Sequence, residues 1–157
     1  MTLTWNGENE LGGGADTALG LTPFGREALK EMERLSIVAD VSHASDALFY
    51  DVAEIAEKPI VASHSNARAV CPHRRNLPTG SFRFCGIRGL VGLNFCVHFL
   101  REDSNAHFED LLRHADHFWS WAGRLPCVWA LITMAPSAAG AGRIEKMQDL
   151  YELFFKT

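Results

Sequence analysis

The chain has 157 residues, a formal net charge of −4 and 47% apolar residues, so it can form one domain with a real hydrophobic core. The mild charge gives no basic stripe, and no run of about 20 apolar residues could span a membrane, so we expect no nucleic-acid and no membrane partner. No secretory leader is recognisable, and the four cysteines form no close Cys-x-x-Cys pair. Their spacing favours reduced thiols in the cytoplasm.

The first part of the chain predicts a strand followed by a helix. Residues 1–5 alternate between apolar and polar side chains, as strands do, and a polar, glycine-rich loop covers 6–20. Thr22 is a good helix cap, and Pro23 suits the first turn because its missing N–H has no partner there. The helical spacing predicts an inner face with Phe24, Ala28, Met32 and Leu35.

Two histidines each follow an apolar run. His43 comes after the run at 37–41, His64 comes after the run at 59–62, and residues 45–58 between them predict a helix. A strand, a crossover helix and a second strand place the two strands parallel, with both carboxyl ends at one edge. Because neutral imidazoles bind zinc, His43 and His64 are candidate metal ligands. The alternative is that both are hydrogen-bonded structural histidines.

The second half continues the alternation of strands and helices. Residues 90–95 predict a strand, Ser104 or Asn105 caps a helix, and 128–134 predict a last strand before a final amphipathic helix. The inner faces of these two helices carry Phe108, Leu111, Leu112, Ala115, Phe118, Ile144, Met147, Leu150 and Phe154. The fold class is therefore α/β, a partial TIM (β/α) barrel with about five parallel strands and flanking helices, since a complete barrel takes about 250 residues. Residues 1–157 form this single partial barrel domain.

Three other polar residues are candidates with two interpretations each. His114 and His117 lie three residues apart on a helix and could face one metal, but they lie near the edge of its apolar face and are read as structural. Asp40 lies in the strand that leads to His43. It either orients a metal ligand or forms hydrogen bonds across the barrel.

Several motifs stand in a consistent order along the chain. They are Thr2-Leu3-Thr4-Trp5-Asn6, Leu21-Thr22-Pro23-Phe24-Gly25, Asp40-Val41-Ser42-His43, Ser63-His64-Ser65, Arg74-Arg75-Asn76 and Gly92-Leu93-Asn94-Phe95. Together they resemble the membrane dipeptidase (renal dipeptidase) family of zinc metallopeptidases, and its bacterial members in particular. The resemblance covers residues 1–77 and 90–123, and more weakly the last helix.

The resemblance implies a barrel enzyme with two Zn²⁺ ions, bridged by a carboxylate and a water, that hydrolyses dipeptides, including those with a C-terminal D-residue. By matching motifs, His43 and His64 would bind the second zinc, and Arg75 would bind the carboxylate of the dipeptide substrate. A planar guanidinium suits bidentate carboxylate recognition. Arg68 and Arg74 are read as solvated surface charges. Trp5 stands where some relatives carry a substrate-binding histidine, and here it would line the pocket.

The chain also departs from the family pattern. The family's first metal ligands lie upstream of the part that matches, and segments 77–89 and 132–143 do not match. Residues 132–136 replace a family motif that carries an aspartate. We therefore expect a truncated or frame-shifted fragment that is inactive alone, exposes strand edges and forms homo-oligomers. The alternatives are a degenerate non-enzymatic remnant and another barrel amidohydrolase; the motif at 74–76 argues against the latter.

Overall fold

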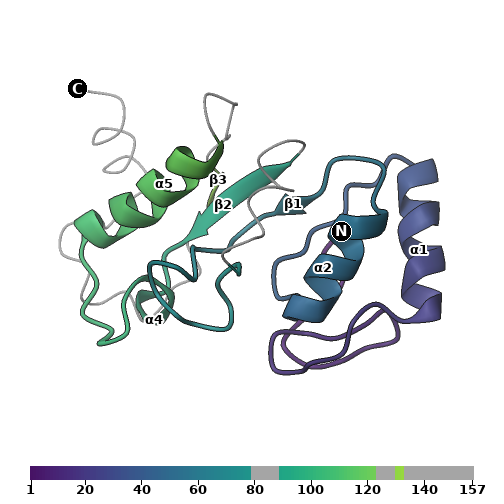
Figure 1. The fold of residues 1–157 in the computed structure, drawn as a ribbon, viewed down its shortest axis with the longest axis horizontal. Helices are drawn as coiled ribbons and strands as arrows, with labels where there is room; N and C mark the ends of the chain where they lie inside the picture. The colour runs from purple at the N-terminus through teal and green to yellow at the C-terminus, as the bar shows by residue number, and fades with distance from the viewer. Residues whose placement is uncertain (79–88, 123–129, 133–157) are drawn as a thin grey trace.

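The structure is a computed structural model, and it describes residues 1–78, 89–122 and 130–132. Figure 1 shows the elements of this part of the chain in space. The helices are α1 (Pro23–Arg34), α2 (Asp46–Ile55), α4 (Val97–Leu100) and α5 (Phe108–Ala122), and the strands are β1 (Val61–Ala62), β2 (Leu90–Asn94) and β3 (Ala130–Ile132).

The strands lie parallel to one another, as the sequence predicts for an α/β fold. The sheet has the order β1-β2-β3, with Val61 opposite Leu90 and Gly92 opposite Ala130. Two further segments extend it through single parallel bridges, because Asp40 pairs with Val61 and Thr2 pairs with Asp40. Five parallel segments therefore lie side by side in the order Thr2, Asp40, β1, β2, β3.

The two predicted strands at 1–5 and 37–41 are reduced to these bridges. Backbone hydrogen bonds flank each bridge, including Leu3 N–H to Asp40 O at 3.2 Å and Val41 N–H to Val61 O at 2.8 Å. Beyond Asp40 the ladder stops, because the Asp40 carboxylate accepts the backbone N–H groups of Ser42 and Ser63. The expected extent of both strands was wrong, while their position and direction were right.

Helix α1 begins where the sequence predicts, and Thr22 Oγ1 accepts a hydrogen bond from Gly25 N at 2.9 Å. Its buried face was predicted only in part, because Met32 is buried as expected while Phe24 and Leu35 are 61% and 52% exposed. The buried residues are Gly25, Leu29 and Met32. A Cβ at Gly25 would lie 2.0 Å from Leu11 O, so this glycine allows the helix to pack closely against the preceding loop and selects the buried face.

The other two long helices differ from prediction at one end. Helix α2 is capped by Ser45 as expected but ends at Ile55, because the Glu33 carboxylate accepts the N–H groups of both Glu57 and Lys58 at 2.8 Å. Helix α5 begins at Phe108, later than a cap at Ser104 or Asn105 predicts. Its predicted core residues Leu111, Ala115 and Phe118 are buried.

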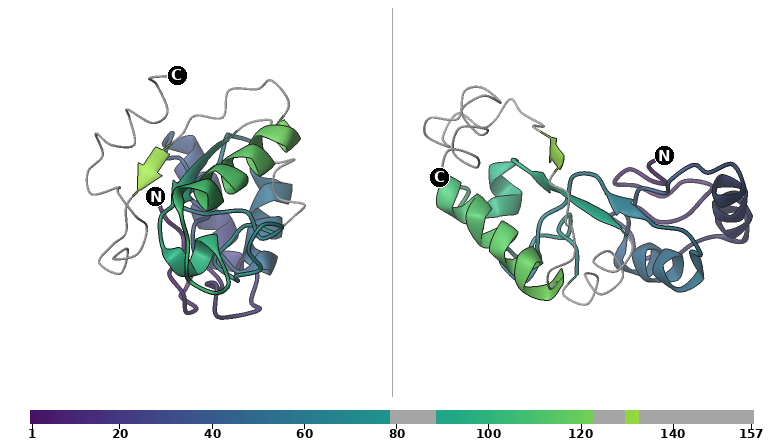
Figure 2. Two further views of the ribbon diagram at one scale, coloured as in Figure 1. Left: turned by 90° about the vertical axis from the view of Figure 1, so that its left-hand side faces the viewer. Right: turned by 90° about the horizontal axis from the view of Figure 1, so that it is seen from above.

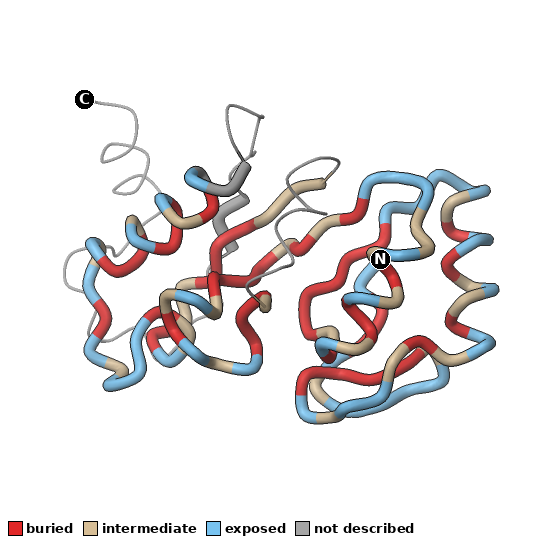
Figure 3. Tube along the Cα trace, viewed as in Figure 1, coloured by how far each residue is buried: buried red, intermediate tan, exposed pale blue. Residues whose placement is uncertain are grey.

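The core lies between the sheet and these helices, and the red segments of Figure 3 trace it along both. Its largest fully buried apolar side chains are Phe49, Leu29, Leu48, Leu93 and Leu111. Figure 2 shows that α1 and α2 cover one end of the row of strands and α5 the other. No helix in the described part of the chain is both long and apolar enough to cross a membrane.

Several sequence predictions fall on residues that the structure does not describe. They are most of the segments 77–89 and 132–143, the ends of the strand predicted at 128–134, and the final helix. Cys71 and Cys96 are free thiols, in agreement with the prediction, while Cys85 and Cys127 lie outside the described residues.

Candidate metal centre

Two imidazoles meet at the carboxyl ends of neighbouring parallel segments. His43 follows the Asp40 segment and His64 follows β1, and their Nε2 atoms lie 2.9 Å apart. Both side chains are buried, and the rings meet edge to face with their centroids 5.0 Å apart. Two nitrogen ligands on one zinc ion are separated by about 3–4 Å, so the pair needs little adjustment to share a metal. The expected convergence at one edge is therefore confirmed.

His43 is held from two sides by the loop that follows the first segment. Its Nδ1 lies 2.8 Å from Asn6 Oδ1, and Trp5 stacks on the ring with centroids 3.9 Å apart. The backbone of His43 has a φ of 70°, in the left-handed region that a non-glycine residue rarely adopts. Such a conformation costs on the order of 1 kcal/mol and persists only where its surroundings fix it. The contacts with Asn6 and Trp5 supply that restraint.

His64 is held by its neighbour in the sequence. Its Nδ1 lies 2.8 Å from Ser63 Oγ, and the Ser63 hydroxyl donates to Asp40 Oδ2 at 2.6 Å. The backbone N–H of His64 donates to Ser42 Oγ at 3.0 Å. A chain of hydrogen bonds therefore runs from Asp40 through Ser63 to the imidazole.

Asp40 joins the two segments that carry the histidines. Its carboxylate accepts from the backbone N–H groups of Ser42 and Ser63, both at 3.0 Å, and from Thr2 Oγ1 at 2.9 Å. Burial alone would raise the pKa of Asp40, but the hydrogen bonds from Ser63, Ser42 and Thr2 outweigh it and lower the pKa. The contacts fit both interpretations of Asp40, because it links neighbouring segments and also reaches His64 through Ser63.

Electrostatics favour the neutral imidazoles that bind metals. Burial, followed by repulsion from the Arg75 cation and from His64 whenever that ring is protonated, lowers the pKa of His43 to about 3. Burial and Arg75 also lower the pKa of His64. The two side chains therefore fit one metal ion as neutral nitrogen ligands. Within the described residues, no group of three or more His, Cys, Asp or Glu side chains could complete such a site.

Arg75 is a buried cation near this pair. Its side chain is only 6% exposed, and burial lowers the pKa of its guanidinium to about 10, with Asp40 acting in the opposite direction. The guanidinium carbon lies 5.6 Å from the centre of the Phe99 ring. Among the described residues the Arg75 guanidinium, which carries five N–H donors, has no hydrogen bond or ion pair; only the backbone N–H of Arg75 is paired, with His73 Nδ1.

The other two arginines of this turn have protein partners. Arg68 binds Asp46 through two nitrogens, at 2.5 and 2.7 Å, and also donates to Asn76 O. Arg74 pairs with Asp16 at 3.1 Å. The expectation of a solvated surface charge was wrong for Arg68, which is partly buried and links α2 to the loop after β1.

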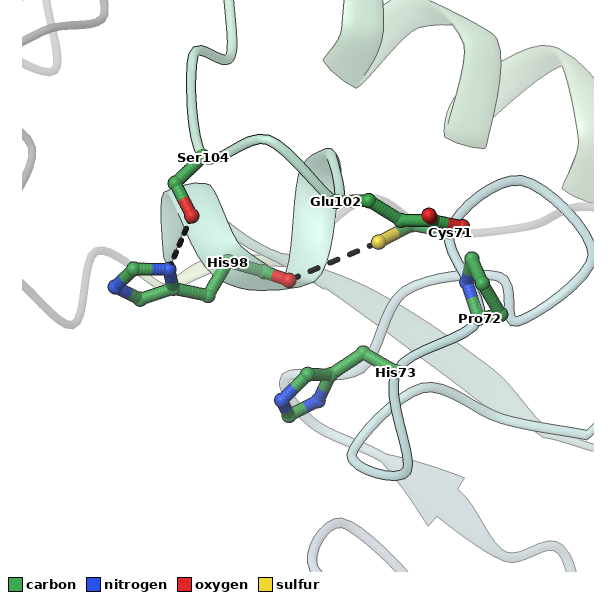
Figure 4. A pocket seen from close by; sticks show the side chains of 6 residues that line it. All are labelled: Cys71, Pro72, His73, His98, Glu102 and Ser104. Carbon is green, nitrogen blue, oxygen red and sulfur yellow. Dashed lines mark hydrogen bonds between the residues drawn. The ribbon is translucent and has the colours of Figure 1, made fainter.

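A separate open cavity of about 460 Å³ lies beside the loop that carries Arg75. Figure 4 shows its wall, formed by Cys71, Pro72, His73, His98, Glu102 and Ser104. His73 Nδ1 accepts the backbone N–H of Arg75 at 3.1 Å, and the His73 ring lies 4.5 Å from that of Phe99. One wall of the cavity therefore supports Arg75, while His43 and His64 do not line it.

The structural interpretation of His114 agrees with its surroundings. The ring is fully buried, its Nδ1 accepts the Ala67 N–H at 3.0 Å, and its Nε2 lies 3.1 Å from Leu100 O. Burial lowers the pKa of His114 to about 4. His117 is partly buried, and its pKa is also lowered by burial.

Sequence reasoning missed the roles of Asn6 and Ser63 in holding the two imidazoles. The rule that polar residues at the ends of parallel strands share one edge of the sheet also points to these two residues. Asn6 follows the first segment, and Ser63 directly precedes His64 at the end of β1. The contact of Trp5 with His43 was also missed, although a position in the pocket was expected.

Comparison with known proteins gives the family of the chain. Residues 1–150 match the model of the membrane dipeptidase family (peptidase family M19). An uncharacterized protein in the pqqA 5′ region of Klebsiella pneumoniae is 39% identical over 128 residues, which are 72% of this chain and 46% of that protein.

Two solved structures are also similar. A metallopeptidase from Rhodobacter sphaeroides, liganded with a phosphinate mimic of the dipeptide L-Ala-D-Ala, is 34% identical with a TM-score of 0.78, over 89% of this chain and 44% of that one. The dipeptidase AC of the same M19 family is 43% identical with a TM-score of 0.65, over 71% of this chain and 33% of that one. The chain thus spans less than half the length of these relatives. It belongs to the membrane dipeptidase family, peptidase family M19.

Proposed function

We propose that the chain forms part of a zinc-dependent dipeptidase, in which His43 and His64 bind the metal and Arg75 binds the carboxylate of the dipeptide. The observation that carries this proposal is the approach of the two buried Nε2 atoms to 2.9 Å. Family membership and the dipeptide mimic bound to the Rhodobacter sphaeroides relative support it. Dipeptides with a C-terminal D-residue are the proposed substrates.

The residues of the chain have separate roles in this reaction. His43 and His64 hold the metal as neutral ligands, and Arg75 fixes the free carboxylate at a distance from them that orients the scissile bond. A zinc ion held by His43 and His64 would supply Lewis-acid polarisation of the scissile carbonyl and would lower the pKa of water to about 7. Asp40 acts on His64 through Ser63.

We further propose that these five parallel segments are part of a (β/α) barrel whose complete site holds two zinc ions. In the described residues only two metal ligands come together, and a bridged two-metal site needs more. We therefore expect the 157 residues alone to bind zinc weakly and not to hydrolyse dipeptides. The competing function is a degenerate, non-enzymatic remnant.

Calorimetric titration of the purified chain with Zn²⁺ tests the proposed ligands. We expect binding that His43→Ala and His64→Ala abolish and that His107→Ala, which changes an exposed histidine, leaves intact. The absence of any zinc binding by the folded wild-type chain would contradict the proposal and favour the remnant.

A second assay tests substrate recognition and the expected inactivity. NMR titration with Gly-D-Ala should shift signals around Arg75 in the zinc-loaded chain but not in Arg75→Met, while Arg74→Met should behave as wild type. No hydrolysis above the enzyme-free rate is expected. Turnover that is lost in His64→Ala would show that the chain alone is an active enzyme.

A further inference from the structure

In each imidazole of the candidate metal centre, the Nδ1 atom, which points away from the other ring, lies at hydrogen-bond distance from an uncharged oxygen. His43 Nδ1 lies 2.8 Å from Asn6 Oδ1, and His64 Nδ1 lies 2.8 Å from Ser63 Oγ. We propose that Asn6 and Ser63 are positioning residues that fix both histidines with the proton on Nδ1, so that both Nε2 lone pairs face the same point before any metal binds. The metal at that point rests on the proposed function; the proton positions do not.

The argument for His43 follows from the chemistry of the amide. An amide oxygen accepts hydrogen bonds and cannot donate them, so the contact with Asn6 Oδ1 requires a proton on His43 Nδ1. A neutral imidazole has one proton, which leaves Nε2 with a free lone pair. The stacked Trp5 ring holds the plane of the imidazole and thus the direction of that lone pair.

The argument for His64 runs through two steps. The Ser63 hydroxyl has one proton, and its shortest contact is the 2.6 Å bond to Asp40 Oδ2. An ionised carboxylate can only accept, so this proton belongs to the Ser63–Asp40 bond. Ser63 Oγ must then accept from His64 Nδ1, which leaves the lone pair of His64 on Nε2. Asp40 therefore sets the proton position of an imidazole that it does not touch.

The resulting arrangement is unfavourable unless a cation lies between the rings. Two lone pairs that face each other at 2.9 Å repel, and both rings are buried where water cannot easily separate them. The left-handed backbone conformation of His43 adds strain at the same site. A site held in this form is preorganised for a metal, because no imidazole must change its tautomer or rotate on binding.

His114 provides the opposite case within the same molecule. Its Nδ1 accepts from the Ala67 N–H, so its proton must be on Nε2, where it is donated to Leu100 O. The two candidate ligands and this structural histidine are thus expected to be different tautomers, which serves as an internal reference.

Two-bond ¹H–¹⁵N correlation spectra of the metal-free chain distinguish these tautomers. Near neutral pH we expect the Nδ1–H form for His43 and His64 and the Nε2–H form for His114. Ser63→Ala should release His64 alone, and Asn6→Leu should release His43 alone. In each variant the zinc affinity measured by calorimetry should fall by about 10–100-fold.

Conservative variants separate positioning from a general effect on folding. Ser63→Thr keeps the hydroxyl and Asn6→Asp keeps the acceptor oxygen, so both should retain the wild-type tautomers and zinc affinity. Ser65→Ala is the matched control, since in the described contacts the Ser65 hydroxyl reaches Ser42 Oγ at 3.3 Å and neither imidazole.

The outcomes distinguish this inference from the proposed function. An Nε2–H form on either ligand histidine, or unchanged tautomers and zinc affinity in Ser63→Ala and Asn6→Leu, would overturn the inference. The expected tautomers in a chain that binds no zinc would support the inference and overturn the proposed metal centre.

Discussion

His114 makes the stability of this fold depend on pH. The pKa of His114 is lowered from 6.5 to about 4 because the ring is buried, so the unfolded chain takes up a proton at a higher pH than the folded chain does. This contribution to stability is fully present above pH 6.5 and is lost as the pH falls towards 4. The expected loss is about 3 kcal/mol, from about 1.4 kcal/mol per pKa unit.

Urea unfolding of the wild type and of His114→Gln between neutral and acidic pH measures this effect. Glutamine can still accept from Ala67 N–H and donate to Leu100 O, but it does not titrate, so the variant should lose less stability on acidification. His107→Gln replaces an exposed histidine and should follow the wild type. Identical pH profiles for all three proteins would refute the assignment.

Residues whose role depends on strand ends were predictable from the sequence, and residues whose role depends on a hydrogen-bond partner were not. The positions of His43 and His64 follow from two apolar runs and the geometry of parallel strands. The strand-end rule also points to Asn6 and Ser63, but which imidazole nitrogen each one contacts depends on side-chain directions, and for Asn6 on the left-handed backbone of His43, which no local pattern encodes. Arg68 was misread for the same reason, since its partner Asp46 lies 22 positions away.

Among the elements, the loop at 6–20 depends on close backbone contacts. A Cβ at Gly14 would lie 1.9 Å from Trp5 O and 2.4 Å from Gly7 O. Gly14→Ala must therefore push away the backbone that places Trp5 and Asn6 against His43. We expect a loss of about 3 kcal/mol in unfolding free energy, as for other overpacked sites, together with weaker zinc binding.

Gly7→Ala is the matched control for this loop, because nothing lies within 4 Å of the position of its added Cβ. Chemical denaturation and calorimetric zinc titration of both variants test the prediction. A Gly14→Ala protein that unfolds and binds zinc like Gly7→Ala would show that the loop does not position the histidines.

For α1 and α2, the start of the helix was more predictable than the buried face of α1 or the end of α2. Thr22 and Ser45 cap α1 and α2 as local rules require. The buried face of α1 is decided by the contact of Gly25 with Leu11 O, and the end of α2 by the carboxylate of Glu33. These are tertiary contacts, and they outweigh local periodicity.

For the molecule as a whole, the alternation of strands and helices was sufficient to predict five parallel segments, since such units rarely fold otherwise. Three of them are strands and two are single bridges, because strand length depends on which neighbours complete the ladder. The sequence carries the order of the segments more clearly than their extent.

The first two of these segments leave apolar side chains exposed beside a strand edge. The amino group of Met1 donates to Val38 O, and the side chains of Met1, Ile37 and Val38 are 56%, 41% and 47% exposed. In the described part of the chain, Thr2 pairs with Asp40 on one side only. An apolar patch at an unpaired edge favours self-association.

We therefore expect the chain to form oligomers whose size increases with concentration. Val38→Lys places a charge in the patch and should shift the chain towards the monomer in sedimentation velocity experiments. Tyr50→Lys places the same charge on α2, at a side chain of similar exposure (44%) outside the patch, and should associate like the wild type. A wild-type chain that stays monomeric at all concentrations would contradict the prediction. If Val38→Lys and Tyr50→Lys dissociate the oligomers equally, the cause is general charge repulsion. Only dissociation by Val38→Lys without dissociation by Tyr50→Lys identifies this edge as the surface that associates.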